Sequence, residues 1–276
     1  MNKSQVVSRE MLVLLSLALS IAWLLPNHTP PWTAFHSEAW ASIIITIVSA
    51  ICLFNSKRIA IGHASLFIGL LAFIPFFQYL TGQIHFFGIA WMSGLYLFGL
   101  MMAIVIGENW EKNSAGQCGN FLFLAILNAA TISVFIQIAQ LNEIQGLDPW
   151  VLNIVSEGRY YANLAQPNQL GSLLILALIA VSLFWNTGKY STTFAVIHSV
   201  FIIFGVYLTG SRTAYLNLAI LALAVFVYRA KFQSKIFVAL AAFVGFLAAL
   251  YLVVWPALVA LGVDTSKTTG FAIAAV

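Results

Sequence analysis

The segment Asn163–Leu170, NLAQPNQL, places hydrogen-bonding side chains directly before a long apolar run. Its amides belong to Asn163, Gln166, Asn168 and Gln169. Pro167 suits the first turn of a helix, because the N–H that proline lacks would have no intrahelical partner there. A helix N-terminus also presents unpaired N–H groups and a partial positive charge, which can bind an anion. A plain polar helix cap is the alternative, although one capping residue would suffice for that purpose.

Two arginines accompany polar motifs of this kind. Arg159 lies just before the first motif, and Arg212 lies in a second one, LTGSRTAYLN, where Gly210 permits a tight turn. Arginine can bind a phosphate through two parallel hydrogen bonds. Two arginines and a helix N-terminus together suggest a site for a diphosphate, carried by a lipid whose tail stays in the bilayer. The alternative for Arg212 is an arginine that extends its charged end to the membrane surface.

The composition indicates the class of protein that must hold these side chains. Hydrophobic residues make up 62% of the 276 residues and charged residues only 7%, whereas a soluble domain has roughly a quarter charged residues. We therefore predict an all-α polytopic integral membrane protein, in which each crossing needs about 20 apolar residues. The nine expected transmembrane stretches are 10–26, 39–54, 62–80, 87–107, 120–141, 168–185, 193–209, 213–228 and 236–255.

The distribution of lysine and arginine predicts the orientation. With a cytoplasmic N-terminus, nine basic residues fall inside and three, which are Arg159, Arg212 and Lys267, fall outside. Both polar motifs then lie on the outer face, together with His28, His36 and Glu38 of the first outer loop. We divide the chain into 1–141 with five helices, 142–192 with the outer segment and the sixth helix, and 193–276 with three further helices.

Several function classes find no support in the sequence. The pI near 9.1 reflects membrane orientation rather than nucleic-acid binding, and no nucleotide-binding motif is present. We expect no disulfide between Cys52 and Cys118, and the spacing of His28, His36 and Glu38 is not that of a metal site. The predicted partners are membrane lipid and a lipid-linked substrate, without nucleic acid, cofactor or metal.

The two motifs also resemble a known family. The stretch GRYYANLAQPNQLGSLLILAL, followed by LTGSRTAYL, is similar to the PglL-type bacterial O-oligosaccharyltransferases, which are grouped with O-antigen ligases and polymerases. The first outer loop, PNHTPPW followed by Glu38, is similar too, and the resemblance covers about residues 20–230. It implies transfer of an oligosaccharide from undecaprenyl diphosphate, at the periplasmic face of the bacterial inner membrane, to Ser or Thr hydroxyls of periplasmic or pilin-like proteins.

The resemblance also implies roles for individual residues. It implies catalytic roles for Gln166, Gln169 and Arg212. It implies that Arg159, Asn168 and Arg212 bind the diphosphate. It implies possible supporting roles for His28, Glu38 and Asn163. Members of the family carry a further periplasmic loop with a histidine used in catalysis, but no histidine follows His198 here. The sequence is therefore expected to be truncated at its C-terminal end. The alternatives are an O-antigen ligase acting on lipid A-core, an O-antigen polymerase and, with less support, a transporter.

Overall fold

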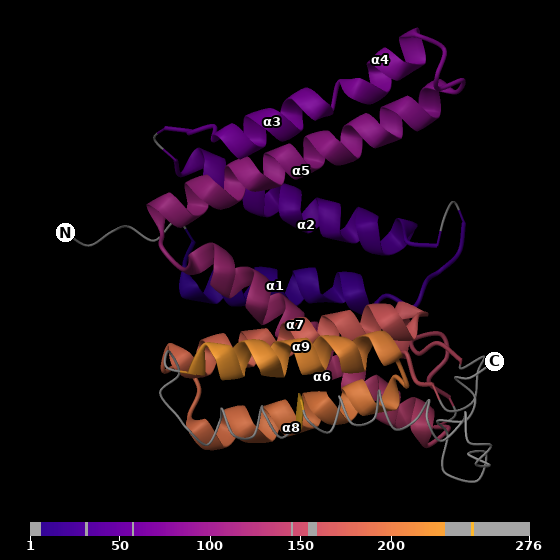
Figure 1. Cartoon of the computed structure of the whole chain (residues 1–276), viewed down its shortest axis with the longest axis vertical. Coiled ribbons are helices and arrows are strands. Elements are labelled where there is room, and N and C mark those ends of the chain that lie inside the picture. The colour runs from indigo at the N-terminus through magenta and orange to yellow at the C-terminus, as the bar shows by residue number, and fades with distance from the viewer. Residues whose placement is uncertain are drawn as a thin grey trace. The chain divides into compact units, whose positions relative to one another are not determined.

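The computed structural model describes residues 7–30, 33–56, 58–144, 146–153, 159–229 and 244–245, and within these ranges the regular structure is entirely helical (Figure 1). In chain order the helices are α1 (Arg9–Leu24), α2 (Phe35–Phe54), α3 (His63–Leu71), α4 (Ile74–Leu80), α5 (Phe87–Asn113), α6 (Gln117–Leu141), the short 3-10 helix η1 (Ala162–Leu164), α7 (Pro167–Asn186), α8 (Thr192–Leu208) and α9 (Arg212–Val227).

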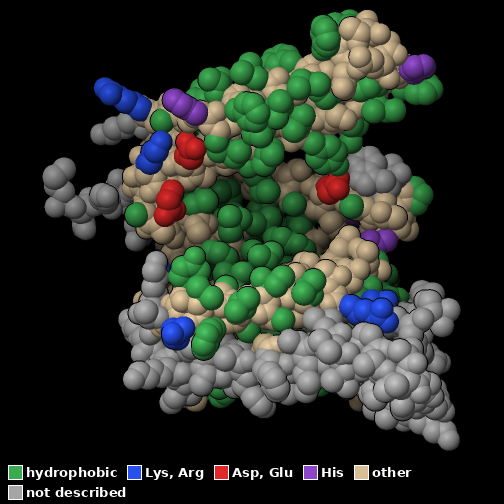
Figure 2. Space-filling view, viewed as in Figure 1, with side chains coloured by type: hydrophobic (Ala, Val, Ile, Leu, Met, Phe, Trp, Pro, Cys, Tyr) green, Lys and Arg blue, Asp and Glu red, His purple; other side chains and the backbone are tan. Residues whose placement is uncertain are grey.

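The helices confirm a helical, multi-pass membrane protein. Among the described residues, five helical segments are long and apolar enough to cross a bilayer: α2, His63–Leu80, α5, α6 and α7. Helices α8 and α9 are apolar but shorter. Many large apolar side chains are exposed, such as Phe67, Phe73 and Phe77, and Figure 2 shows hydrophobic side chains spread over the visible helices. Such surfaces suit a lipid environment. The number nine and the cytoplasmic N-terminus stay predictions, and the stretch 236–255 lies outside the described residues except for 244–245.

The expected stretch 62–80 consists of two helices rather than one. Helix α3 ends at Leu71, and α4 starts after Phe73, with Pro75 in its first turn. Proline has no N–H, and its ring would collide with the carbonyl of Leu71, four residues earlier. The backbone instead tightens, with the N–H of Phe73 donating to Leu70, three residues back. Hydropathy alone does not reveal this break, and His63–Leu80 as a whole is still long and apolar enough to cross a bilayer.

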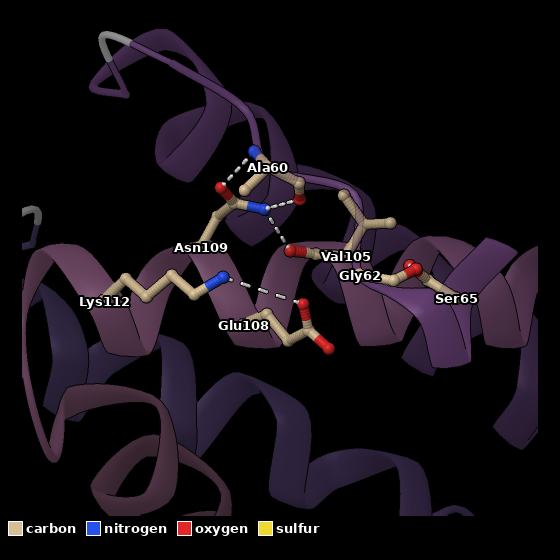
Figure 3. Close-up of polar contacts among 7 residues, drawn as sticks. All are labelled: Ala60, Gly62, Ser65, Val105, Glu108, Asn109 and Lys112. Atoms are coloured by element: carbon tan, nitrogen blue, oxygen red, sulfur yellow. Dashed lines mark hydrogen bonds and ion pairs between the residues drawn. The ribbon is translucent and has the colours of Figure 1, made fainter.

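The described chain forms two units, of which the first contains residues 1–16 and 42–122. In this unit α5 packs along α3 and α4 (Figure 1). Asn109 of α5 fixes the loop before α3, because its carboxamide exchanges two hydrogen bonds of 2.8 Å with the backbone of Ala60 (Figure 3). The neighbouring Glu108 pairs with Lys112 at 3.9 Å and lies against Gly62, where a Cβ would come within 2.6 Å of its carboxylate. A side chain at position 62 would therefore displace Glu108.

The second unit contains residues 17–41 and 123–276, and its core is built around α7. Helix α7 packs against both α8 and α9 (Figure 1). The approach of α7 to α9 depends on Gly171, because a Cβ there would lie 2.5 Å from the Cβ of Ala214. Gly205 of α8 likewise leaves room for Val134 of α6. Small residues at such crossings let helix backbones approach closely, as is common between membrane helices.

Candidate functional site

The segment before α7 has an unusual backbone that presents the amide motif. After η1, Ala165 adopts a left-handed conformation with φ 58°, Gln166 is extended as the N-cap, and Pro167 begins the helix. The prediction that Pro167 opens a helix is confirmed. Ala162, at φ 50°, is a second residue with a conformation that a side chain disfavours. Such conformations persist only where surrounding contacts fix them, so the partners of this segment matter.

Asn163 is one of those fixing contacts. Its side chain is buried, with 2% exposed, and its N–H₂ group donates to the carbonyl oxygens of Leu24 and Trp150, both at 2.8 Å. Its side-chain oxygen accepts a hydrogen bond of 3.1 Å from the N–H of Leu152. The amide therefore joins the end of α1 to the loop near residue 150. With both donor hydrogens engaged, Asn163 holds the motif in place rather than contacting a substrate.

Two glutamines of α6, which the sequence analysis did not single out, complete this framework. Gln140 accepts from the N–H of Ala162 at 3.0 Å and donates to the carbonyl oxygens of Ala162 and Leu152. Gln137, fully buried, donates to the carbonyl oxygens of Tyr160 and Gly205. Each of these hydrogen bonds matters, because a buried polar group left without a partner costs about 1–3 kcal/mol. Gln137 and Gln140 are three residues apart, so their side chains lie on the same face of the apolar helix α6. This spacing is the sequence signal that could have predicted polar partners for that face.

His28 connects the loop between α1 and α2 to the motif. Its Nε2 lies 2.8 Å from the carbonyl oxygen of Asn163, and its Nδ1 lies 3.1 Å from the carbonyl oxygen of Thr33. Both partners are acceptors, so a neutral ring can donate to one of them and a protonated ring to both. Neither nitrogen is placed to take a proton from a substrate. His28 therefore bridges two backbone segments, and its supporting role in the reaction stays a prediction.

A cavity of about 380 Å³ lies beside this bridge. The lining residues are Ala22, Trp23, His28, Thr33, Ala34, Ser37, Asn163, Leu164, Ala165, Gln166 and Gln169. The structure thus brings together Gln166, Gln169, His28 and Asn163 of the predicted site. Glu38, Asn168, Arg159 and Arg212 are not among the lining residues, although Ser37 next to Glu38 is. Within the described ranges, no group of three or more His, Cys, Asp or Glu side chains could hold a metal ion.

Asn168 joins the two polar motifs. Its side-chain oxygen accepts a hydrogen bond of 2.6 Å from the hydroxyl of Ser211, which caps α9 by accepting from the N–H of Ala214. The helices α7 and α9 therefore begin side by side. Arg212 is the exposed first residue of α9. The juxtaposition of the two motifs, expected from the topology alone, is present in the structure.

Arg159 lies at the same end of the second unit. The N–H of the next residue, Tyr160, donates to the carbonyl oxygen of Leu208 at the end of α8, shortly before Arg212. Arg159 is partly buried, and its Nε atom is buried without a hydrogen-bond partner among the described residues. A buried guanidinium nitrogen without a partner is costly and is suited to an acceptor such as a phosphate oxygen.

Comparison with known proteins agrees with the motifs. The chain is 30% identical over 218 residues to a general O-oligosaccharyltransferase of Acinetobacter baylyi, a match that covers 77% of this chain and 37% of that protein. It is 27% identical, over 79% of its length, to a ComP-specific O-oligosaccharyltransferase of the same bacterium, of which it covers 39%. This chain is a relative of the O-oligosaccharyltransferases. The resemblance inferred from NLAQPNQL and LTGSRTAYL is thereby confirmed.

The extent of the match is limited to one part of the relatives. The chain spans less than two fifths of the length of the curated oligosaccharyltransferases it matches. No family model matches the sequence, and no solved structure matches it.

Proposed function

We propose that the protein transfers an oligosaccharide from undecaprenyl diphosphate to Ser or Thr hydroxyls of periplasmic or pilin-like proteins, at the periplasmic face of the bacterial inner membrane. The observation that carries the proposal is the similarity to a general and to a ComP-specific O-oligosaccharyltransferase. The cavity that Gln166 and Gln169 line, and the arginines at the same end of the second unit, support it.

The chemistry of the transfer explains why positive charge is needed. The bond between the anomeric carbon of the glycan and the diphosphate oxygen breaks, and the diphosphate leaves with the electron pair. The acceptor hydroxyl oxygen bonds to the anomeric carbon and gives up its proton. Negative charge grows on the leaving diphosphate, so preorganised donors that meet it there lower the barrier. No nucleotide is consumed, because the diphosphate lipid is already activated.

Arg212 and Arg159 are the groups proposed to meet that charge. Arg212 stands at the first residue of α9, and the free N–H groups of the first turn of α7 lie beside it through the contact between Asn168 and Ser211. Since the oxygen of Asn168 is bound to Ser211, its N–H₂ group is the part that can donate to a phosphate. This assigns the diphosphate to the junction of α7 and α9.

Gln166 and Gln169 are proposed to orient the reacting groups in the cavity. A carboxamide can donate and accept hydrogen bonds, but it cannot take the proton of the acceptor hydroxyl. His28 is an unsuitable base in this arrangement, because both of its ring nitrogens face backbone carbonyls. The two glutamines therefore have positioning roles and Arg212 a charge-stabilising role, and the proton of the acceptor hydroxyl passes to water at the membrane surface.

The test measures glycan transfer in cells that lack an O-oligosaccharyltransferase of their own and make a lipid-linked glycan. The protein is expressed from its complete reading frame with a candidate pilin, and glycan on the pilin is read by intact mass. Transfer by the wild type, and a loss of about 100-fold in Arg212→Ala, would support the proposal. Arg229→Ala, at the other end of α9, is the matched control and should retain activity.

One outcome would contradict the proposed reaction, and another would contradict only the proposed residue roles. Glycan found on lipid A-core, or in long repeat polymers, but not on the pilin would favour an O-antigen ligase or a polymerase. Full transfer by Gln166→Ala, Gln169→Ala and Arg212→Ala would remove the proposed catalytic roles while leaving the reaction itself in place.

A further inference from the structure

The cavity is lined by side chains without a formal charge at neutral pH, whereas Arg212 stands at the start of α9, outside this lining. Its polar side chains are the amides of Gln166 and Gln169, the hydroxyls of Thr33 and Ser37, and the groups of His28 and Asn163 that are bound to backbone. No lysine, arginine, aspartate or glutamate is among its lining residues. A doubly charged phosphate group taken into such a cavity would lose water without gaining an opposite charge, which is unfavourable.

The hydrogen-bonding groups at the cavity fall into two sets. The buried amide of Asn163 is engaged with backbone groups, and so are the ring nitrogens of His28. The side chains of Gln166, Gln169 and Ser37 have no hydrogen-bond partner among the described residues, and both glutamines are exposed. The second set therefore supplies neutral donors and acceptors that a ligand in the cavity can use.

Trp23 gives the cavity an aromatic wall. It lies near the end of α1, beside Leu24, whose carbonyl oxygen accepts from Asn163, and it packs against the core of the second unit. An indole ring offers a rigid apolar face with a polar N–H at its edge. The face of a pyranose ring that carries axial C–H groups packs on such a surface, while its hydroxyls bond to amides and hydroxyls at the side.

Building on the proposed function, we propose that this cavity binds a sugar ring of the glycan, and that the diphosphate lies outside it at Arg159 and Arg212. The volume of about 380 Å³ lies within the range of about 300–1,000 Å³ found for small-molecule sites. Trp23 and Ser37 then determine how tightly the sugar is held, and Gln166 and Gln169 connect the sugar to the reacting bond.

The experiment compares two lipids on the protein, expressed from its complete reading frame and held in nanodiscs. The first is the lipid-linked oligosaccharide isolated from the cells used to measure transfer, and the second is bare undecaprenyl diphosphate. Dissociation constants come from native mass spectrometry. The variants are Trp23→Leu and Ser37→Ala in the cavity, and Arg212→Ala at the helix junction. Trp23→Phe, which keeps an aromatic face, is the control for loss of packing, and thermal unfolding checks that each variant is folded.

The proposal predicts a separation of effects. Ser37→Ala should weaken binding of the glycan-bearing lipid by about fivefold, as expected for one hydrogen bond between neutral groups, and Trp23→Leu by at least as much. Both variants should change the dissociation constant for bare undecaprenyl diphosphate by less than twofold. Trp23→Phe should retain most of the affinity for the glycan-bearing lipid. Arg212→Ala should weaken the binding of both lipids to a similar degree, because both carry the diphosphate.

The contrary outcomes are distinct. If the cavity variants weaken both lipids equally, or weaken neither, the cavity does not bind the sugar, while the proposed transferase function stands. If the wild type binds neither lipid, the proposed function fails and the sugar site fails with it.

Discussion

The hydroxyl of Ser211 donates a 2.6 Å hydrogen bond to the side-chain oxygen of Asn168, and so ties the start of α9 to the start of α7. The same hydroxyl accepts from the N–H of Ala214 and caps α9. One small side chain thus fixes both a helix end and the junction at which we place the diphosphate. The residues are 43 positions apart in the chain, so only the tertiary fold brings them together.

Ser211→Ala is expected to lower both stability and transfer. Loss of the cap costs about 0.5–2 kcal/mol, and loss of the bond to Asn168 frees the two helix ends from each other. Ser191→Ala is the matched control, because Ser191 caps α8 in the same way and has no hydrogen bond to another helix among the described residues. Thermal unfolding in detergent should fall in both variants, whereas glycan transfer should fall only in Ser211→Ala. Equal transfer by the two variants would show that the junction is not needed.

Gln140→Met is expected to loosen the segment before α7. The carboxamide meets the backbone of Ala162 at both its N–H and its carbonyl oxygen, and methionine fills similar space without replacing these bonds. Each backbone group left unpaired costs about 1–3 kcal/mol. Hydrogen exchange should rise at residues 150–153 and 159–165 while α7 keeps its protection. Gln83→Met, at an exposed position, is the control, and unchanged exchange around Ala162 in Gln140→Met would disprove the bracing role.

Asn163→Asp is expected to be strongly destabilising despite its similar shape. The carbonyl oxygens of Leu24 and Trp150 would face an oxygen in place of the N–H₂ group that now donates to both. Breaking a buried polar network in this way costs about 3 kcal/mol or more. Such surroundings raise the pKa of the new carboxyl, which can donate only when protonated, so the destabilisation should shrink as pH falls. Asn142→Asp, exposed, should show neither effect in thermal unfolding measured from pH 5 to 8.

The starts of α7 and α9 could be predicted from sequence because local chemistry determines them. Pro167 fits only the first turn, and Ser211 is a strong capping residue, so both boundaries follow from neighbouring residues. The meeting of the two motifs could also be predicted, since a bilayer restricts where polar groups lie. The membrane topology therefore predicted that the two motifs lie near each other, which helix propensity alone does not predict.

The bracing residues could not be predicted in the same way. Gln137 and Gln140 lie in an apolar helix, and their partners are backbone groups of Tyr160, Ala162 and Gly205. Which backbone group lies opposite a side chain depends on the left-handed conformation of Ala162, and a sequence gives no indication of that conformation at an alanine. The resemblance implied roles for Gln166 and Gln169, but it could not show that the cavity they line lacks charged side chains, or that Arg159 and Arg212 are not among its lining residues.

The contact between Gly171 and Ala214 allows the closest test of how α7 and α9 are held together. Gly171→Ala would place two Cβ atoms 2.5 Å apart, and overpacking of this kind costs about 1–3 kcal/mol. Gly99→Ala is the control, because a Cβ there meets nothing within 4 Å and alanine favours a helix.

Adding Ala214→Gly to Gly171→Ala should restore much of the lost stability. The methyl group would then move from α9 to α7, and the nearest remaining atoms would be the Cα of Ala214 at 3.5 Å and the Cβ of Ser211 at 3.9 Å, which are ordinary contacts. The loss of unfolding free energy in the double variant should therefore be smaller than the sum of the two single losses by about 1 kcal/mol or more. Thermal unfolding of the four proteins measures this coupling, and glycan transfer should recover with it because Asn168 and Ser211 return to bonding distance. Simple additivity would mean that the two helices are not in contact at these residues.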